Sequence, residues 1–556
     1  MAATPKPHEN TLYYGDNLDV LKRHIPAESV DLVYLDPPFK SDQDYNVLFA
    51  EHSGQRSASQ IKAFEDTWRW DQGAARAYED TVEAGGRVAE AMRAIRTFLG
   101  ESDMMAYLAM MAPRLVELRR VLKPTGSIFL HCDPTASHYL KLLMDAAFGP
   151  ANFRNEIIWQ RTVSKGLMTK RLPTNHDVLL SYQVSAAATW NIDAAFTPYD
   201  PDDLPEKTQQ KYSMRDPDGR PYQLTSLINP NANRPNLTYE FLGVTRVWRW
   251  TRARMQAEYE KGLVVQPGPG KVPRFKRYLD TQRGVPFGDV WTDIPPLNAQ
   301  AQERLGYPTQ KPEALLDRIV QISTQEGDRV LDPFCGCGTT VSTAQRLNRR
   351  WVGIDITHLA ITLIKHRLLS AFGKAATFGV VGEPVSLPDA EALAKSDAYQ
   401  FQWWALGLVG ARPTEQKKGA DRGIDGRLFF HDENIGGKTK QIILSVKAGG
   451  VTVAHLRDLR GVLDREKAEI GVLISLEEPT APMRKEAASA GFYESGEWRK
   501  KHPRLQLLTI GQILDGKGID CPFFRTDVTF KAAPRVKPKA KPPGTQQRLL
   551  DDDDNT

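Results

Sequence analysis

Residues 330–340 read VLDPFCGCGTT, an apolar run that breaks into a glycine-rich turn. A helical stretch continues to Arg349, and a second apolar run over 351–355 ends in Asp355. Two apolar runs joined by a helix of this length predict two parallel strands with a crossover helix. Because the faces of a parallel sheet must be covered by helices, this unit directs the chain towards an α/β fold.

Strand and helix patterns alternate on both sides of a long irregular stretch, which extends the same prediction over most of the chain. Apolar residues recur at helical spacing in the long stretches, and the short runs between them are rich in β-branched and aromatic residues. We therefore predict a Rossmann-like α/β sheet with helices on both faces. The predicted strands lie at 12–14, 32–35, 127–131, 329–331 and 351–355, and the predicted helices at 18–24, 103–122, 136–148 and 313–324.

The chain of 556 residues is too long for a single hydrophobic core, and its composition changes along its length. The alternating pattern lapses in a stretch rich in Pro, Asn and Arg, and a further α/β segment follows near the C-terminus. The final residues are rich in Pro and Lys and then acidic, which predicts disorder. The predicted parts are a first half of the sheet (1–150), an insert (151–305), a second half of the sheet (306–384), a smaller α/β domain (385–530) and a tail (531–556).

Several bulk properties predict a cytoplasmic protein. No apolar run approaches the roughly 20 residues that a membrane-spanning helix needs. The N-terminal segment has no apolar core of the kind that a signal peptide requires. Four cysteines in a chain of this length argue against a disulfide framework.

The glycine-rich turn has the composition of a nucleoside-binding loop. Gly336 and Gly338 would let the backbone approach a ligand closely, and Asp355 at the next strand end could accept hydrogen bonds from ribose hydroxyls. The dinucleotide-binding pattern requires a third glycine, and Val341 occupies that position. The loop therefore predicts a nucleoside-bearing cofactor other than NAD.

A second unusual stretch, DLVYLDPPFK, ends a predicted strand at residues 31–40. Asp36-Pro37-Pro38-Phe39 can neither continue the strand nor start a helix, because the prolines fix the backbone and remove N–H donors. The result is a stiff turn that offers a carboxylate, free carbonyl groups and an aromatic ring. Such a turn is suited to holding a flat, polar group.

Together the two motifs resemble those of the DNA methyltransferases that modify exocyclic amino groups. Members acting on adenine N6 or cytosine N4 carry a D-P-P-[YF]-type tetrapeptide and an F-x-G-x-G loop, matched here by residues 36–39 and 334–338. The tetrapeptide precedes the loop, as in the β class, where the stretch between them recognises the target sequence. Three shorter matches are Gly15-Asp16, Asn175-His176-Asp177 and Thr309-Gln310-Lys311-Pro312.

The resemblance implies S-adenosylmethionine as cofactor and double-stranded DNA with a flipped target base as substrate. Asp36 and the Pro37 carbonyl would accept the two N–H bonds of the target amino group and direct its lone pair to the methyl donor. Pro38 would stiffen the turn, and Phe39 would stack on the flipped base. The cofactor-binding residues implied by the resemblance are Asp16, Lys311, Pro312, Asp332, Pro333, Phe334, Gly336, Gly338, Thr339 and Asp355.

The tetrapeptide D-P-P-F favours adenine N6, and the leading alternative is cytosine N4. Methylation of a ring carbon is disfavoured because the chain contains no Pro-Cys pair. Basic and aromatic residues interleave between about 159 and 280, a composition suited to nucleic acid, although a local aromatic core with solvated charges would give the same pattern. A methyltransferase half that only senses cofactor or DNA, methylation of RNA or protein, and a homodimer all stay open.

The C-terminal α/β segment resembles the restriction-endonuclease-like core, in particular its Mrr-type branch. Gly423-Ile424-Asp425-Gly426 opens one strand, and a second strand ends in Ser445-Val446-Lys447. The resemblance implies a site in which Asp425 holds Mg²⁺ and Lys447 orients water. Ser445 stands where the family has Glu or Gln, so the domain either recruits another acid for cleavage or binds DNA without cutting it. A fused nuclease-like module of this kind suggests a restriction-modification or phage-defence system.

Overall fold

The structure is a computed structural model of the chain, and it describes residues 9–38, 69–163, 172–200, 203–298, 301, 303–305, 307, 309–414, 423–432, 439–495 and 499–522. Two compact units are present. One comprises residues 191–288, and the other contains the rest of the chain on both sides of it.

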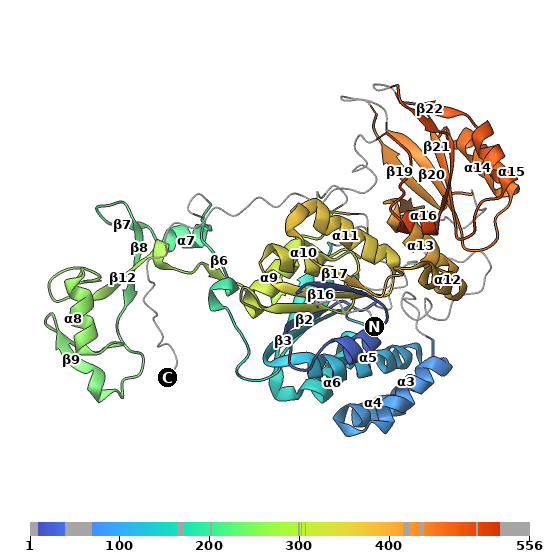
Figure 1. The fold of residues 1–556 in the computed structure, drawn as a ribbon. Coiled ribbons are helices and arrows are strands. Elements are labelled where there is room, and N and C mark those ends of the chain that lie inside the picture. The colour runs from blue at the N-terminus through green and yellow to red at the C-terminus, as the bar shows by residue number, and fades with distance from the viewer. Residues whose placement is uncertain are drawn as a thin grey trace. The chain divides into compact units, whose positions relative to one another are not determined.

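A nine-stranded sheet forms the centre of the larger unit (Figure 1). Its strand order is β14-β4-β5-β3-β2-β15-β16-β1-β17, and the strands from β3 to β17 in this order are parallel. The sequence of strands and helices confirms the predicted Rossmann-like α/β class. The strands are β1 (Thr11–Tyr14), β2 (Val30–Leu35), β3 (Leu122–Cys132), β4 (Phe153–Gln160), β5 (His176–Gln183), β14 (Val290–Trp291), β15 (Arg329–Asp332), β16 (Arg350–Asp355) and β17 (Gly379–Val381).

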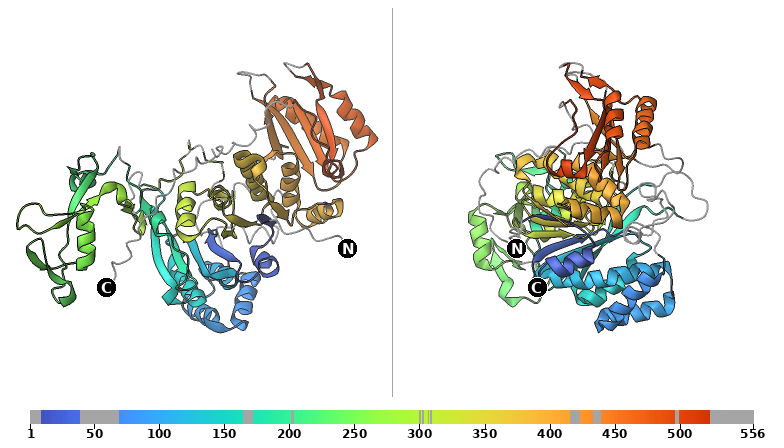
Figure 2. Two further views of the ribbon diagram at one scale, coloured as in Figure 1. Left: turned by 60° about the vertical axis from the view of Figure 1, so that its left-hand side comes forward. Right: turned by 45° about the vertical axis from the view of Figure 1, so that its right-hand side comes forward.

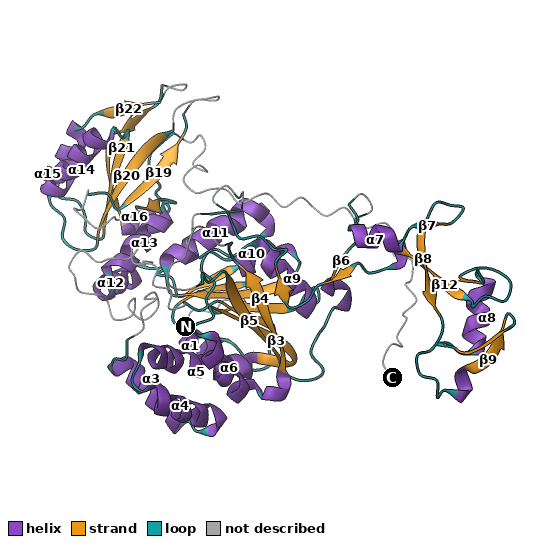
Figure 3. Cartoon of the chain, turned by 180° about the vertical axis from the view of Figure 1, so that it is seen from behind, coloured by secondary structure: helices purple, strands orange, loops and turns teal. Residues whose placement is uncertain are grey.

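Helices cover both faces of this sheet (Figure 3). Because successive side chains of a strand point to opposite faces, β2 contributes to two cores. Val33 and Leu35 pack with one set of helices, whereas Leu32 and Tyr34 pack with the other set. The first set is α1 (Asn17–His24), α3 (Gln72–Glu83), α4 (Gly86–Leu99), α5 (Asp103–Val121) and α6 (Ser137–Phe148), and the second is α9 (Glu313–Ser323), α10 (Thr339–Arg346) and α11 (His358–Phe372).

Three strands of this sheet, β4, β5 and β14, come from the stretch that the sequence assigned to the insert at 151–305. Strand β5 is antiparallel to β3, and β4 is antiparallel to β5. The run from Val178 to Tyr182 is buried and contributes to both cores. The compact inserted unit, 191–288, is therefore narrower than the predicted insert.

The inserted unit contains a four-stranded sheet in the order β11-β12-β8-β7 and a hairpin of β9 and β10. A small core of six buried residues holds it together, with Trp248 among the largest fully buried side chains of the chain. Its elements are β6 (Phe196–Thr197), α7 (Glu206–Lys211), β7 (Met214–Arg215), β8 (Pro221–Ser226), β9 (Thr238–Phe241), β10 (Val244–Val247), α8 (Arg252–Glu260), β11 (Val264–Val265), β12 (Arg274–Tyr278) and β13 (Val285–Pro286).

The C-terminal α/β domain is drawn in orange and red in Figure 2. Its five-stranded sheet has the order β18-β19-β20-β21-β24. Helix α13 packs on one face, where Trp403 and Trp404 are buried, and α14 and α15 pack on the other. The elements are α12 (Leu387–Ser396), α13 (Ala398–Leu408), β18 (Arg412–Pro413), β19 (Gly426–Phe430), β20 (Lys440–Lys447), α14 (Val453–Glu466), β21 (Ile470–Ser475), α15 (Ala481–Ser489), β22 (Phe492–Glu494), β23 (Lys501–Pro503), β24 (Leu505–Thr509) and α16 (Ile510–Leu514).

Three further expectations concern the chain as a whole. The tail at 531–556, predicted to be disordered, lies outside the described residues. Among the residues that the structure describes, none of the helices combines the length and the apolar character needed to cross a bilayer. All four cysteines are buried and free, in agreement with the prediction that no disulfide framework exists.

Candidate active site

Four strand ends converge at one edge of the nine-stranded sheet. Adjacent parallel strands are paired so that Leu331 lies beside Val33, and Asp355 lies beside Tyr14. Parallel strands end at the same edge of a sheet, where α/β proteins bind their ligands. The acidic residues that follow or end these strands therefore share this edge. They are Asp36 after β2, Asp332 at the end of β15, Asp355 at the end of β16 and Asp16 after β1.

The glycine loop between β15 and α10 is tied to the two acids that flank it. The Phe334 N–H donates to Asp332 Oδ1 at 3.1 Å, and the Gly336 N–H donates to Asp355 Oδ2 at 2.9 Å. Burial raises the pKa of the Asp332 carboxyl to about 7 and that of Asp355 to about 6. The loop thus presents backbone and two shielded carboxyl groups, which suits a nucleoside with hydroxyl donors.

Gly336 and Gly338 adopt the left-handed conformation, with φ of +49° and +74°. A Cβ at Gly336 would lie 3.2 Å from Cε1 of the half-buried Tyr307 ring. A side chain at this position would therefore strain the backbone and push against Tyr307. The absence of a side chain keeps the loop close to its neighbours, which is the feature expected of a cofactor-binding turn.

An arginine that the sequence analysis did not identify connects the first strand end to this loop. Arg114, from α5, donates through Nη2 to Asp16 Oδ2 at 2.7 Å and through Nε to Asn17 Oδ1 at 2.6 Å. Asn17 in turn donates to the Pro333 carbonyl at 2.8 Å. Asp16 also caps α1 by accepting from the Leu18 N–H. These contacts fix the start of α1 against the glycine loop.

Asp36 forms an ion pair with Lys311. The distance between Lys311 Nζ and Asp36 Oδ2 is 2.6 Å, and the two side chains are only 13% and 16% exposed. The resemblance placed Lys311 among the cofactor-binding residues, and the structure places its ammonium group on the predicted catalytic acid. Pro37 and Pro38 follow Asp36 without helix or strand, whereas Phe39 lies outside the described residues.

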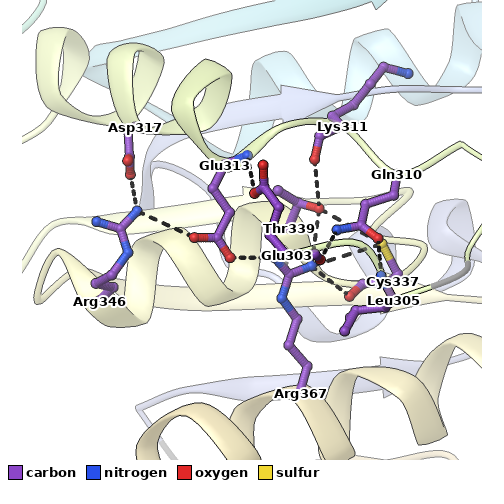
Figure 4. A network of polar contacts seen from close by, with 10 residues as sticks. All are labelled: Glu303, Leu305, Gln310, Lys311, Glu313, Asp317, Cys337, Thr339, Arg346 and Arg367. Carbon is purple, nitrogen blue, oxygen red and sulfur yellow. Dashed lines mark hydrogen bonds and ion pairs between the residues drawn. The ribbon is translucent and has the colours of Figure 1, made fainter. Parts of the chain in front are cut away.

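The segment that carries Lys311 is held by its own side chains (Figure 4). Buried Gln310 donates to the Glu303 carbonyl at 2.6 Å and accepts from the Leu305 N–H at 2.8 Å. The Glu313 N–H donates to Glu303 Oε2 at 2.9 Å. These bonds close a compact turn before α9 and fix the backbone on both sides of Lys311.

Arg367 joins this segment to the glycine loop (Figure 4). Its guanidinium is buried and donates to Glu313 Oε1 at 2.7 Å and to Thr339 Oγ1 at 3.2 Å. The Thr339 hydroxyl donates to the Lys311 carbonyl at 3.4 Å. Nothing in the motifs indicated Arg367, because it lies on a helix with an ordinary apolar pattern.

A buried polar chain starts at Tyr34, two residues before the predicted catalytic acid Asp36. The Tyr34 hydroxyl is 2.8 Å from His131 Nδ1, and His131 Nε2 is 3.1 Å from Asp177 Oδ2. Burial acts to raise the pKa of Asp177, but the His131 hydrogen bond and the charges of Lys311 and Arg161 outweigh it and lower the pKa. Asp177 belongs to the Asn175-His176-Asp177 match, so the structure gives this short motif a position beside the site.

Trp248 belongs to the core of the inserted unit, and Trp250 packs against that core. Trp248 is fully buried, and the guanidinium of Arg254 lies 4.5 Å from the centre of the Trp250 ring. The local-core reading of the basic and aromatic pattern therefore holds for these tryptophans. Positive charge is in excess in this part of the chain, because residues 220–283 contain twelve Lys and Arg against four Asp and Glu.

The predicted nuclease residues meet at the start of β19 and the end of β20. Asp425 Oδ2 accepts from the Ser445 hydroxyl at 3.0 Å and from the Val446 N–H at 2.7 Å, and Lys447 ends β20. The described residues contain no group of three or more His, Cys, Asp or Glu side chains that could hold a metal ion. One carboxylate already bonded by its neighbours does not fit Mg²⁺, which needs several oxygen ligands.

Comparison with known proteins agrees with the fold and the site. Residues 30–366 match the model of the DNA methylase family of N6 and N4 methyltransferases, so the chain belongs to this family. It is an amino-group DNA methyltransferase. Residues 398–515 match the family described as NACHT-associated inactive restriction endonuclease 1.

Three curated relatives illustrate the range of similarity. The type II methyltransferase M.EcaI of Enterobacter cloacae is 26% identical over 66% of this chain and 70% of its own length. The Mod subunit of the type III restriction-modification enzyme StyLTI of Salmonella typhimurium is 26% identical over 68% of this chain, which spans only 56% of that relative. The DNA adenine methyltransferase YhdJ of Escherichia coli is 44% identical over 64% of this chain and 82% of its own length.

The match at 398–515 corrects one expectation from the sequence. The restriction-endonuclease-like fold is confirmed, but the matching family is an inactive one. Of the two alternatives that Ser445 left open, magnesium-dependent cleavage is thus not supported, in agreement with the bonded state of Asp425.

Proposed function

We propose that this protein transfers a methyl group from S-adenosylmethionine to adenine N6 in double-stranded DNA. The observation that carries the proposal is the convergence of Asp36 and the glycine loop at one edge of the sheet, from segments some 300 residues apart. The adenine assignment is supported by the D-P-P-F tetrapeptide and by YhdJ, which is named an adenine methyltransferase.

The cofactor would be held by the glycine loop and by the acids at the ends of β15 and β16. When bound, it supplies an electrophilic methyl group on sulfur. Asp355 would accept the ribose hydroxyls, and the bare backbone at Gly336 would pass beside the ligand. Asp332 would lie beside the methionine part, with Asp16 near the adenine ring.

Asp36 would act on the target base. Its carboxylate would accept one N–H bond of the amino group, and the Pro37 carbonyl would accept the other. This orientation points the nitrogen lone pair at the methyl group and places negative charge where positive charge develops. The base must leave the duplex to reach this edge, and Phe39 is the proposed stacking residue.

The inserted unit is the proposed DNA-recognition region. Its excess of positive charge suits binding to phosphates, and it contains exposed arginines on and after β10, namely Arg246 and Arg249. The C-terminal domain is proposed to bind DNA without cleaving it.

Mass spectrometry of nucleosides from DNA treated with the purified protein tests the proposal. N6-methyladenine should form with S-adenosylmethionine, and Asp36→Ala should lower the rate about 100-fold or more while cofactor affinity stays unchanged. Asp19→Ala, which removes an exposed carboxylate on α1, is the matched control and should retain full activity. Detection of N4-methylcytosine alone would replace adenine by cytosine as the target, and an unaltered rate in Asp36→Ala would remove the assigned acid.

A further inference from the structure

The proposed chemistry assigns no role to the ion pair between Lys311 and Asp36. Lys311 Nζ lies 2.6 Å from Asp36 Oδ2, so one of the two carboxylate oxygens is already an acceptor. Both side chains are mostly shielded from water, where a charge-assisted bond is stronger than at the surface. The acid is therefore engaged before any base arrives.

A fixed ammonium group at this position would oppose methyl transfer. The target nitrogen becomes positively charged as it takes the methyl group, and the proposed role of Asp36 is to favour that charge. A cation bonded to the same carboxylate weakens this effect and repels the positively charged cofactor. The ion pair thus suits the state before the base enters and does not suit the transfer itself.

The backbone of Lys311 is held in place, so a movement of its ammonium group would have to come from the side chain alone. Its carbonyl accepts from the Thr339 hydroxyl, and its neighbour Gln310 is bonded at both ends of its amide. A second acid lies within the reach of its charge, since Lys311 contributes to lowering the pKa of buried Asp177. Asp177 Oδ1 faces Arg161 Nε at 3.2 Å but makes no hydrogen bond.

We propose that Lys311 is a placeholder for the target base: its ammonium group occupies the Asp36 acceptor until an amino group displaces it. This inference rests on the proposed function and deepens it. Lys311 is then a positioning residue, which keeps the acceptor oriented in the empty enzyme and makes room for a base that offers an N–H bond. A base without an amino group cannot make the exchange.

The test compares two duplexes that carry the sequence found to be methylated. One has adenine at the target position, and the other has unsubstituted purine, which lacks the amino group. Binding is measured with S-adenosylhomocysteine, so that no transfer occurs. In the wild type, adenine gains a hydrogen bond to Asp36 only by breaking the bond between the Lys311 ammonium group and Asp36. The protein should therefore bind the two duplexes with similar affinity.

In Lys311→Met the acceptor is open, and adenine gains a hydrogen bond without displacing a cation. The preference for adenine over purine should therefore exceed that of the wild type by about 10- to 100-fold, the range expected for one hydrogen bond to a charged group. The weaker pairing of purine in the duplex affects both proteins equally and cancels in this comparison. Lys311→Arg, which restores the cation, should return the preference to the wild-type value.

Lys123→Met is the matched control, because Lys123 forms an ion pair of 2.8 Å with Asp31 near the other end of β2. It should leave both the preference and the S-adenosylhomocysteine affinity unchanged. An equal preference in Lys311→Met and wild type would overturn the inference, and a simultaneous loss of S-adenosylhomocysteine affinity would assign Lys311 to the cofactor pocket. Wild-type protein that methylates no DNA base would instead remove the proposed function itself.

Discussion

Burial sets the protonation of the carboxyl group at the end of β15. The pKa of Asp332 is raised from 3.8 to about 7, so the group stays protonated in the folded protein at a pH where the unfolded chain is already ionised. Its contribution to stability is fully present below pH 4 and is lost as the pH rises through about 7. Asp332→Asn keeps an acceptor for the Phe334 N–H and removes the ionisation.

The variant Asp332→Asn should therefore unfold at a higher temperature than wild type at pH 8, with a smaller difference at pH 5. Thermal unfolding at the two pH values, without cofactor, measures this. Asp19→Asn, at an exposed position, should show no such pH-dependent gain. An equal difference in unfolding temperature between Asp332→Asn and wild type at both pH values would contradict the raised pKa of Asp332.

A second prediction for a single residue concerns Gly336. Gly336→Ala should lower cofactor affinity with little effect on DNA binding, because its Cβ would press on Tyr307 in the loop proposed to hold the ligand. Gly373→Ala imposes a similar positive φ with open space around the Cβ, so it separates backbone strain from the local contact. Isothermal titration with S-adenosylhomocysteine compares the two. Equal affinities in both variants would place the ligand elsewhere.

Short motifs identified the acids at the strand ends but not the residues that hold them. Asp36 and Asp355 were singled out as acids that follow or end apolar runs, and Asp332 was implied by the family resemblance. Arg114 and Arg367 were not predicted, because each lies in a helical pattern that looks the same whether the arginine is exposed or buried. Their partners are far away in sequence, so only the folded chain reveals them.

At the level of elements, strands in runs with clear periodicity were predicted well, but the pairing of strands in the sheet was not predicted. Strands β1, β2, β15 and β16 lie within a residue or two of their predicted positions. Strand β5 was assigned to the insert, because a buried apolar run carries no sign of the partner it will join or of its direction. Helices α3 and α4 were not predicted, since their sequences contain many small and charged residues.

Trp248 shows how much the inserted unit depends on one side chain. It is fully buried in a core of six residues, so Trp248→Ala should cost about 3–5 kcal/mol and unfold this small unit selectively. Limited proteolysis should then cut within 191–288, while S-adenosylhomocysteine affinity is retained. Trp190→Ala removes a half-exposed ring and is the control. Resistance of the Trp248 variant to proteolysis would show that the core tolerates the cavity.

The charge of the whole molecule is concentrated in one place. The chain carries a formal net charge of only +5, and residues 220–283 alone have eight more Lys and Arg than Asp and Glu, from twelve against four. The double variant Arg246→Gln/Arg249→Gln should weaken DNA binding and lower the slope of log affinity against log salt by about one per lost phosphate contact. Arg23→Gln on α1 should leave the slope unchanged. Binding titrations at several salt concentrations measure it.

The strand order has a consequence for how the chain is made. The two neighbours of β1 in the sheet are β16 and β17, which are translated more than 330 residues after it. A growing chain therefore holds an unpaired strand throughout most of its synthesis, and incomplete products lack the edge at which chemistry would occur. Premature termination before β15 should therefore yield fragments that neither methylate DNA nor compete for the methyl donor.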